Sequence, residues 1–204
     1  ITDENHKKLS KRSGHSSYED LVEQGFLPEA IVNYIALLGW SPEDNREIFT
    51  LDELIKEFDY HRISKSPAVF DYTKLKWMNG EYIKNMDEEK YLSLVIPRLE
   101  KVIKNKNLDL KKIALLLQKR LETLNDIPAL VDFFDELPEY TTDLYVHKKM
   151  KTTEEIALSS LKACVPVLEG ITDWNETVIH DTLMNLVTEL GIKNGQLLWP
   201  VRTA

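Results

Sequence analysis

PEAIVNYIALLGW, residues 28–40, is a nearly all-apolar stretch, and it decides the fold of the first part of this 204-residue chain. Pro28 suits the first turn of a helix, and Gly39 followed by Pro42 suits its end. We therefore predict a helix over 28–39. Its apolar side chains point almost all round the axis, and a helix of that kind has to be buried. This helix should be the centre of the first packed region.

Helix signals continue on both sides of this stretch. Ser16 and Glu19 form a capping box that predicts a short helix, which Gly25 should close in the left-handed conformation. Thr50 and Glu53 predict a second capped helix. Between residues 47 and 86 we predict a short strand over 47–50, an ordered loop over 61–72 and a helix with Trp77, Tyr82 and Ile83 in a core.

The rest of the chain should be helical. We predict a helix from Asp87 that Pro97 interrupts, and helices over 110–124 and 128–137. A helix capped by Thr152 and Glu155, kinked by Pro166 and ended by Gly170 should follow, and then a last helix that ends before Gly191.

The composition favours an all-α, mainly helical fold with at most a short strand. The chain has 7 glycines, 43% hydrophobic and 29% charged residues, a profile typical of compact helix-rich proteins. We predict two regions, residues 1–86 and residues 87–204, which meet near 84–90; the second should be a helical bundle. No apolar run approaches the roughly 20 residues that span a bilayer, so we expect a cytoplasmic chain without a membrane partner.

Cysteine and histidine usage argues against a metal or disulfide scaffold. The single cysteine, Cys164, lies in the apolar string LKACVPVL and should be a buried thiol. The five histidines show no ligand spacing, so we predict no metal site in this chain.

The net charge of −8 is unevenly distributed. Residues 98–120 hold eight cations and two acids, whereas residues 121–145 hold seven acids and no cation. Such segregation can orient a polyanion toward one face and repel it from another. Two solvated helical faces would give the same pattern, and both interpretations stay open at this point.

A second cluster of cations lies at residues 7–14, KKLSKRSG. Lys7, Lys8, Lys11 and Arg12 surround the small hydroxyl of Ser10, in the manner of a loop that handles phosphate groups. A solvated basic turn is the alternative on these residues alone.

The string KLSKR resembles the second signature loop of class I aminoacyl-tRNA synthetases, usually quoted as KMSKS, in the form found in bacterial glutamyl-tRNA synthetases. The strings GFLPEAIVNYIALLGWSP, REIFTLDELIKEF, ISKSPAVFD and KLKWMNGEYI resemble the stem-contact region that follows this loop in that family, in the same order. Ser13 departs from the aspartate that many members have there. Glutaminyl-tRNA synthetases share the loop but carry β-barrel anticodon domains, whereas the residues after Asp87 read as helical.

The resemblance implies the C-terminal part of an enzyme that joins glutamate to tRNA(Glu) through an adenylate, with ATP and Mg²⁺. It implies that Lys11 holds the ATP phosphates and that Lys8, Ser10 and Arg12 order the catalytic loop. ATP and glutamate would bind mainly through an N-terminal domain outside this chain, so we expect the chain alone to be an inactive monomer with no bound cofactor.

The string KRLETLNDIP, residues 119–128, resembles the helix from which discriminating glutamyl-tRNA synthetases present an arginine to the third anticodon base. That arginine would be Arg120, with Lys111, Lys112 and Lys119 contacting the anticodon arm. On a helix over 110–124, Arg120 falls within the apolar stripe and must be paired or must face a partner. An ion pair with Asp126 or Asp132 is the structural alternative. A helical RNA-binding or protein-interaction module without a catalytic parent is the alternative function.

Overall fold

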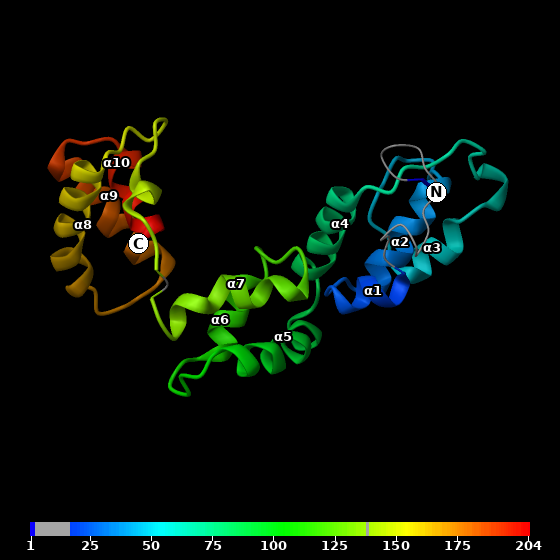
Figure 1. Ribbon diagram of the computed structural model, residues 1–204, viewed down its shortest axis with the longest axis horizontal. Helices are drawn as coiled ribbons and strands as arrows, with labels where there is room; N and C mark the ends of the chain where they lie inside the picture. Colours follow the sequence, from blue (N-terminus) through cyan, green and yellow to red (C-terminus); the bar gives the residue numbers. More distant parts are fainter. Residues whose placement is uncertain (3–16, 138) are drawn as a thin grey trace. The chain divides into compact units, whose positions relative to one another are not determined.

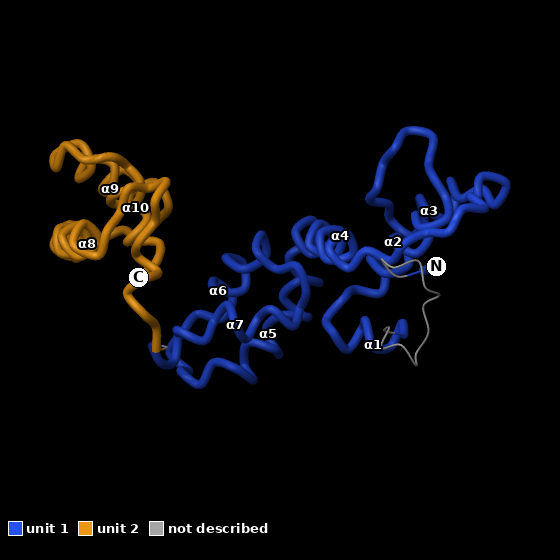
Figure 2. The backbone as a smooth tube through the Cα atoms, turned by 45° about the horizontal axis from the view of Figure 1, so that its top comes forward, with its two compact units in different colours: residues 1–138 blue, residues 139–204 orange. Residues whose placement is uncertain are grey.

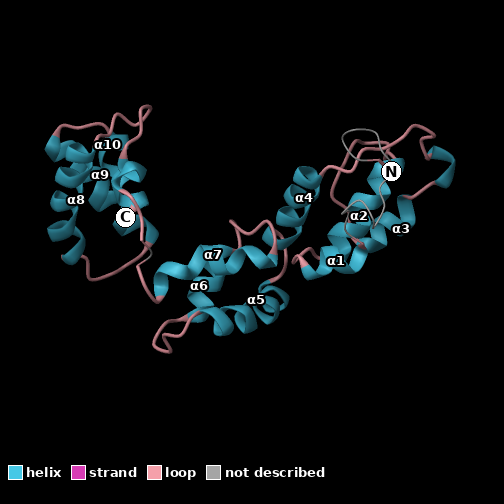
Figure 3. Ribbon diagram, in the orientation of Figure 1, coloured by secondary structure: helices cyan, strands magenta, loops and turns pink. Residues whose placement is uncertain are grey.

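The structure, a computed structural model, describes residues 1–2, 17–137 and 139–204. Within these ranges it contains α-helices and short 3₁₀ helices but no strand, which confirms the predicted all-α fold (Figure 3). No described helix combines the length and the apolar character that crossing a membrane requires.

The chain divides into two compact units, residues 1–138 and residues 139–204 (Figure 2). One apolar core of the first unit joins Leu27 and Ala30 to Tyr91, Val95 and Leu99, so its packing continues across residue 86. The predicted division at 86/87 is therefore not a division between compact units. As a division between two functional regions it stays a prediction.

The first unit begins with the helices that surround the apolar stretch (Figure 1). Its elements are α1 Tyr18–Glu23, α2 Pro28–Gly39, α3 Leu51–Glu57, the 3₁₀ helix Tyr60–Arg62, α4 Tyr72–Lys84, α5 Glu88–Val102, α6 Leu110–Leu117, the 3₁₀ helix Leu124–Asp126, α7 Ile127–Val131 and the 3₁₀ helix Asp132–Phe134. The second unit contains the 3₁₀ helix Thr142–Tyr145, α8 Glu154–Glu169, α9 Glu176–Leu190 and α10 Asn194–Thr203.

Helix α2 packs against α1, α3 and α4. Ala30, Ile31 and Tyr34 are buried, but Val32 is 41% and Ile35 46% exposed. The prediction that α2 is buried on all sides is therefore wrong for one face, because its packing partners cover the other. The predicted bounds, 28–39, are confirmed.

Local sequence signals located several helix ends. Thr50 and Glu53 form the predicted capping box of α3, and Gly25 follows α1 with a φ of +89°. The cap of α1 is Ser17 with Asp20, one residue later than predicted; Ser16 lies outside the described residues. Thr153, rather than Thr152, caps α8, since Thr152 pairs with His147.

The predicted strand over 47–50 is wrong. The backbone N–H of Phe49 donates to Oδ1 of Asn33 at 2.9 Å, and the carbonyl of Phe49 accepts from the hydroxyl of Tyr82. Side chains of α2 and α4 therefore take the backbone groups that a neighbouring strand would have used. Of the residues predicted in a core on α4, Ile83 is buried and Tyr82 half-buried, but Trp77 is 44% exposed.

Three further differences concern helix lengths. The helix predicted over 128–137 ends at Val131, where the 3₁₀ helix Asp132–Phe134 follows. Pro97 does not interrupt α5, which continues to Val102, because Tyr91, Val95 and Leu99 bury one continuous face. Helix α10 was not predicted, and α9 is not the last helix. In the second unit Leu183, Leu186, Val187 and Leu197 pack around Cys164, whose predicted burial is confirmed and raises the pKa of its thiol.

Candidate nucleic-acid interface

The predicted phosphate-contacting residues Lys8, Ser10, Lys11 and Arg12 lie outside the described residues. Their roles stay predictions.

Two predicted tRNA contacts, Lys111 and Lys112, are exposed on the first turn of α6. Asp109 caps this turn by accepting the backbone N–H of Lys112 at 3.0 Å. Nζ of Lys111 lies 2.7 Å from Oε1 of Glu88, and this hydrogen bond raises the pKa of the lysine. Within the described ranges no ion pair engages Lys112, so its charge is more available to a phosphate.

Helix α6 ends at Leu117, seven residues before the predicted end, and this changes the interpretation of Arg120. The backbone N–H groups of Arg120 and Leu121 both donate to the carbonyl of Leu117, at 2.8 and 3.1 Å, and close a turn. Lys119 and Arg120 are exposed on this turn. The prediction that Arg120 lies in the apolar stripe of a longer helix is therefore wrong.

The alternative of an ion pair for Arg120 is also not observed in the described part of the chain. Asp126 accepts instead from the backbone N–H of Glu122 at 3.2 Å and of Thr123 at 2.7 Å. The carboxylate that could have paired with Arg120 thus holds the following turn together. A guanidinium on this turn is left with its donors toward solvent.

The acidic segment after Arg120 is also partly structural. Asp135 accepts the backbone N–H groups of Lys104, at 2.8 Å to Oδ2, and of Asn105, at 3.0 Å. These bonds lower the pKa of the Asp135 carboxyl. One acid of the acidic segment, Asp135, therefore binds backbone donors of the basic segment.

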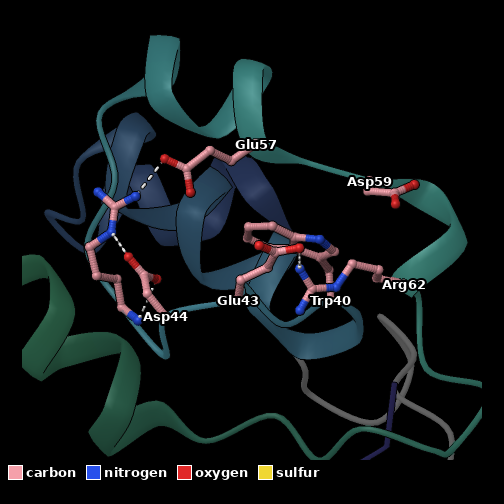
Figure 4. Close-up of a pocket in the computed structure, with 7 residues that line it drawn as sticks. Trp40, Glu43, Asp44, Glu57, Asp59 and Arg62 are labelled. Atoms are coloured by element: carbon pink, nitrogen blue, oxygen red, sulfur yellow. Dashed lines mark hydrogen bonds and ion pairs between the residues drawn. The ribbon is translucent and has the colours of Figure 1, made fainter.

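A polar pocket of about 460 Å³ lies between α3 and the segment that follows α2 (Figure 4). Its Arg46 is paired, with Nε 2.6 Å from Oδ2 of Asp44 and Nη2 bonded to Glu57. Carboxylates outnumber guanidinium groups four to two, so the pocket is unsuited to a phosphate. The lining residues are Trp40, Glu43, Asp44, Arg46, Glu57, Asp59 and Arg62.

Sequence reasoning missed the residues that hold the turn of Arg120. Gln118 Nε2 donates to the carbonyls of Ile83 and Met86, at 3.1 and 2.9 Å. Asn79 is fully buried and bonds to the backbone of both Leu27 and Glu122. The sequence did contain a signal for Asn79, because this asparagine follows Met78 on the apolar face of α4. A buried amide needs hydrogen-bond partners, so an asparagine at that position indicates contacts with other segments.

Two family models match successive segments of this helical chain, and they place it among the class I aminoacyl-tRNA synthetases. The model described as "tRNA synthetases class I (E and Q), catalytic domain" matches residues 1–77. The model described as "Anticodon binding domain" matches residues 73–204, and the chain belongs to this family.

Individual relatives with high sequence identity are glutamate–tRNA ligases. Over 204 residues, all of this chain and 41% of the relative, the sequence is 59% identical to the glutamate–tRNA ligase of Lachnoclostridium phytofermentans. It is 54% identical to that of Clostridium acetobutylicum over 98% of this chain and 41% of the relative. A crystal structure of a glutamate tRNA ligase from Elizabethkingia meningosepticum, in complex with its amino acid, superposes with a TM-score of 0.73 at 29% identity, over 99% of this chain and 43% of that one.

These findings confirm the resemblance to glutamyl-tRNA synthetases. The chain spans about two fifths of the length of the relatives it matches.

Proposed function

We propose that this chain is the tRNA-contacting part of an ATP-dependent ligase that attaches glutamate to tRNA(Glu). The observation that carries the proposal is the similarity to glutamate–tRNA ligases along the whole chain, with a synthetase model and an anticodon-binding model in successive segments. The alternative, a helical module without a catalytic parent, finds no support in these comparisons.

The proposed parent uses ATP with Mg²⁺ and glutamate, and works as a cytoplasmic monomer. Bound ATP supplies the α–β phosphoanhydride bond, which breaks when the glutamate carboxylate attacks the α-phosphorus, so that the adenylate forms and pyrophosphate leaves. In this chain Lys11 would hold its phosphates, while Lys8, Ser10 and Arg12 would order the loop. Two lysines, an arginine and a hydroxyl are a donor set that fits a triphosphate.

We propose further that Arg120 reads the third anticodon base. Support comes from its exposure on a turn and from the rigid anchoring of that turn. A guanidinium offers a planar fork of donors that pairs with two acceptors on one base edge, which is how an arginine distinguishes bases. Lys111, Lys112 and Lys119 would contact the phosphates of the anticodon arm, which adds affinity but no sequence information.

Glutamate charging by the full-length enzyme tests both levels of this proposal. Transcripts of tRNA(Glu) and of a variant with a changed third anticodon base would be compared by kcat/KM. Arg120→Gln should lose about 1–3 kcal/mol of the preference for the glutamate anticodon. Lys112→Ala, the matched control, should weaken both transcripts alike and leave the preference unchanged.

Two results would contradict the proposal, each at its own level. An equal loss on both transcripts for Arg120→Gln removes the base-reading role but not the enzyme. An enzyme that charges no tRNA with glutamate contradicts the proposed activity itself.

A further inference from the structure

Asn79, in the middle of α4, joins two segments that lie far apart in the sequence. It is 0% exposed. Its Oδ1 accepts the backbone N–H of Leu27 at 2.7 Å, and its Nδ2 donates to the carbonyl of Glu122. One buried amide therefore satisfies a backbone donor at the start of α2 and a backbone acceptor two residues after Arg120.

We infer that Asn79 is a positioning residue that fixes the turn of Arg120 on the α1–α2 loop and thereby sets how selectively the third anticodon base is read. This inference rests on the proposed function of Arg120. It assigns the precision of base reading to a residue that touches no nucleotide.

A second set of contacts holds the same turn to the same loop. The backbone N–H of Leu124 donates to the carbonyl of Gly25 at 3.0 Å, and Nδ2 of Asn125 donates to the carbonyl of Glu23 at 2.8 Å. The two backbones approach so closely that a Cβ on Gly25 would lie 2.6 Å from the nitrogen of Asn125. The turn can therefore occupy this place only while residue 25 is glycine.

The anchored residues adjoin the backbone of Arg120 in the sequence. Leu121 is buried, and its N–H is bonded to the carbonyl of Leu117, as is that of Arg120. The backbone of Arg120 thus lies between the end of α6 and a turn clamped to α4 and to the α1–α2 loop. A shift of about 1 Å in such a support is enough to spoil a bidentate contact.

The residues that Asn79 joins belong to segments matched by two different family models. Residues 23–27 lie in the segment matched by the synthetase catalytic-domain model, and Arg120 lies in the segment matched by the anticodon-binding model. Both segments belong to the first compact unit. The amide of Asn79 therefore ties the reading of the anticodon to the stem-contact part of the same unit.

Asn79→Asp tests the inference in the full-length enzyme. The substitution keeps the size and the acceptor for Leu27 but replaces the donor that faces the carbonyl of Glu122 with an oxygen. Asn33→Asp is the matched control: Asn33 is 1% exposed, its Oδ1 accepts the backbone N–H of Phe49, and its Nδ2 has no partner among the described residues. Both variants bury a carboxylate in the same unit, but only one faces the turn.

The readout is the ratio of kcat/KM for tRNA(Glu) to that for the third-base variant, together with the melting temperature. Asn79→Asp should lower this ratio by about threefold or more, a substantial part of the roughly 5- to 150-fold that removal of the base contact would cost. Asn33→Asp should lower the melting temperature but leave the ratio unchanged. In an Arg120→Gln background, Asn79→Asp should have no further effect on the ratio.

The inference is overturned if Asn79→Asp changes the ratio no more than Asn33→Asp does, or if its effect persists without Arg120. Should Asn79→Asp fail to fold, Asn125→Ala serves instead, because Asn125 is exposed and loses only its bond to Glu23. If Arg120→Gln itself leaves the ratio unchanged, both the base-reading proposal and this inference fail. If only the Asn79 and Asn125 variants leave it unchanged, the base-reading proposal stands alone.

Discussion

Gly25→Ala should lower the free energy of unfolding of the first unit by about 2–5 kcal/mol. Gly25 has a φ of +89°, and the Cβ of an alanine at this position would lie 2.6 Å from the nitrogen of Asn125 and 2.9 Å from that of Leu124. The left-handed conformation costs an alanine about 1–2 kcal/mol. Both close contacts are to backbone atoms, so the turn has to move away.

Movement of the turn breaks specific hydrogen bonds. The bond from Leu124 N–H to the carbonyl of Gly25 contributes about 1 kcal/mol, and a buried Nδ2 of Asn79 without its acceptor costs about 1–3 kcal/mol. The smaller conformational freedom of alanine in the unfolded chain offsets roughly 0.4–1 kcal/mol. The net loss is therefore about 2–5 kcal/mol.

Hydrogen–deuterium exchange of peptides measures this loss separately in each unit. Amides of α2 should exchange about thirtyfold faster or more, while those of α8, in the second unit, should be unaffected. Gly39→Ala is the control within the first unit, because the nearest atom to its Cβ would be a side-chain carbon of Ile63 at 3.8 Å. Unchanged exchange in α2 after Gly25→Ala, or an equal increase in α8, would refute the reasoning.

Two further predictions concern pH and the second core. Asp135 has a lowered pKa in the folded chain, so its hold on the amides of Lys104 and Asn105 should be present above about pH 4 and lost as the pH falls through the folded value. Amide exchange at these two residues should show that dependence, and Asp135→Asn should abolish it; an unaltered profile would contradict the assignment. Leu197→Ala, at a 0% exposed site in the second unit, should cost about 2–5 kcal/mol and speed exchange in the helices of that unit, α8 to α10, but not in α2. Faster exchange in α2 as well would show that the two units do not unfold separately.

The sequence predicted those features that depend on neighbours along the chain. The capping box of Thr50 and Glu53, the left-handed Gly25 and the bounds of α2 follow from contacts within a few residues, and all three are confirmed. Gly191 likewise ends α9 with a φ of +62°. The resemblance to glutamyl-tRNA synthetases was also recognisable from strings of the sequence without a structure, and the comparisons confirm this resemblance.

The site itself depended on contacts between distant residues. The periodicity of residues 110–124 continues past Leu117, since Leu121 and Leu124 are both buried, yet the helix does not. The turn that replaces it is stabilised by groups on α4, at the end of α1 and in the loop between α1 and α2, 35 to 102 positions away in the sequence. Periodicity indicates that a side chain is buried, but it does not indicate whether the backbone at that residue is helical.

For that reason the sequence alone determined the helical class, several helix ends and the family, whereas only the tertiary structure placed Arg120 on an exposed turn and bonded Asn79 to the backbone of Glu122. The local signals arise from hydrogen bonds that close within one turn of helix. The position of Arg120 arises from a buried amide and a close glycine contact that form only when α4, the α1–α2 loop and the end of α6 come together.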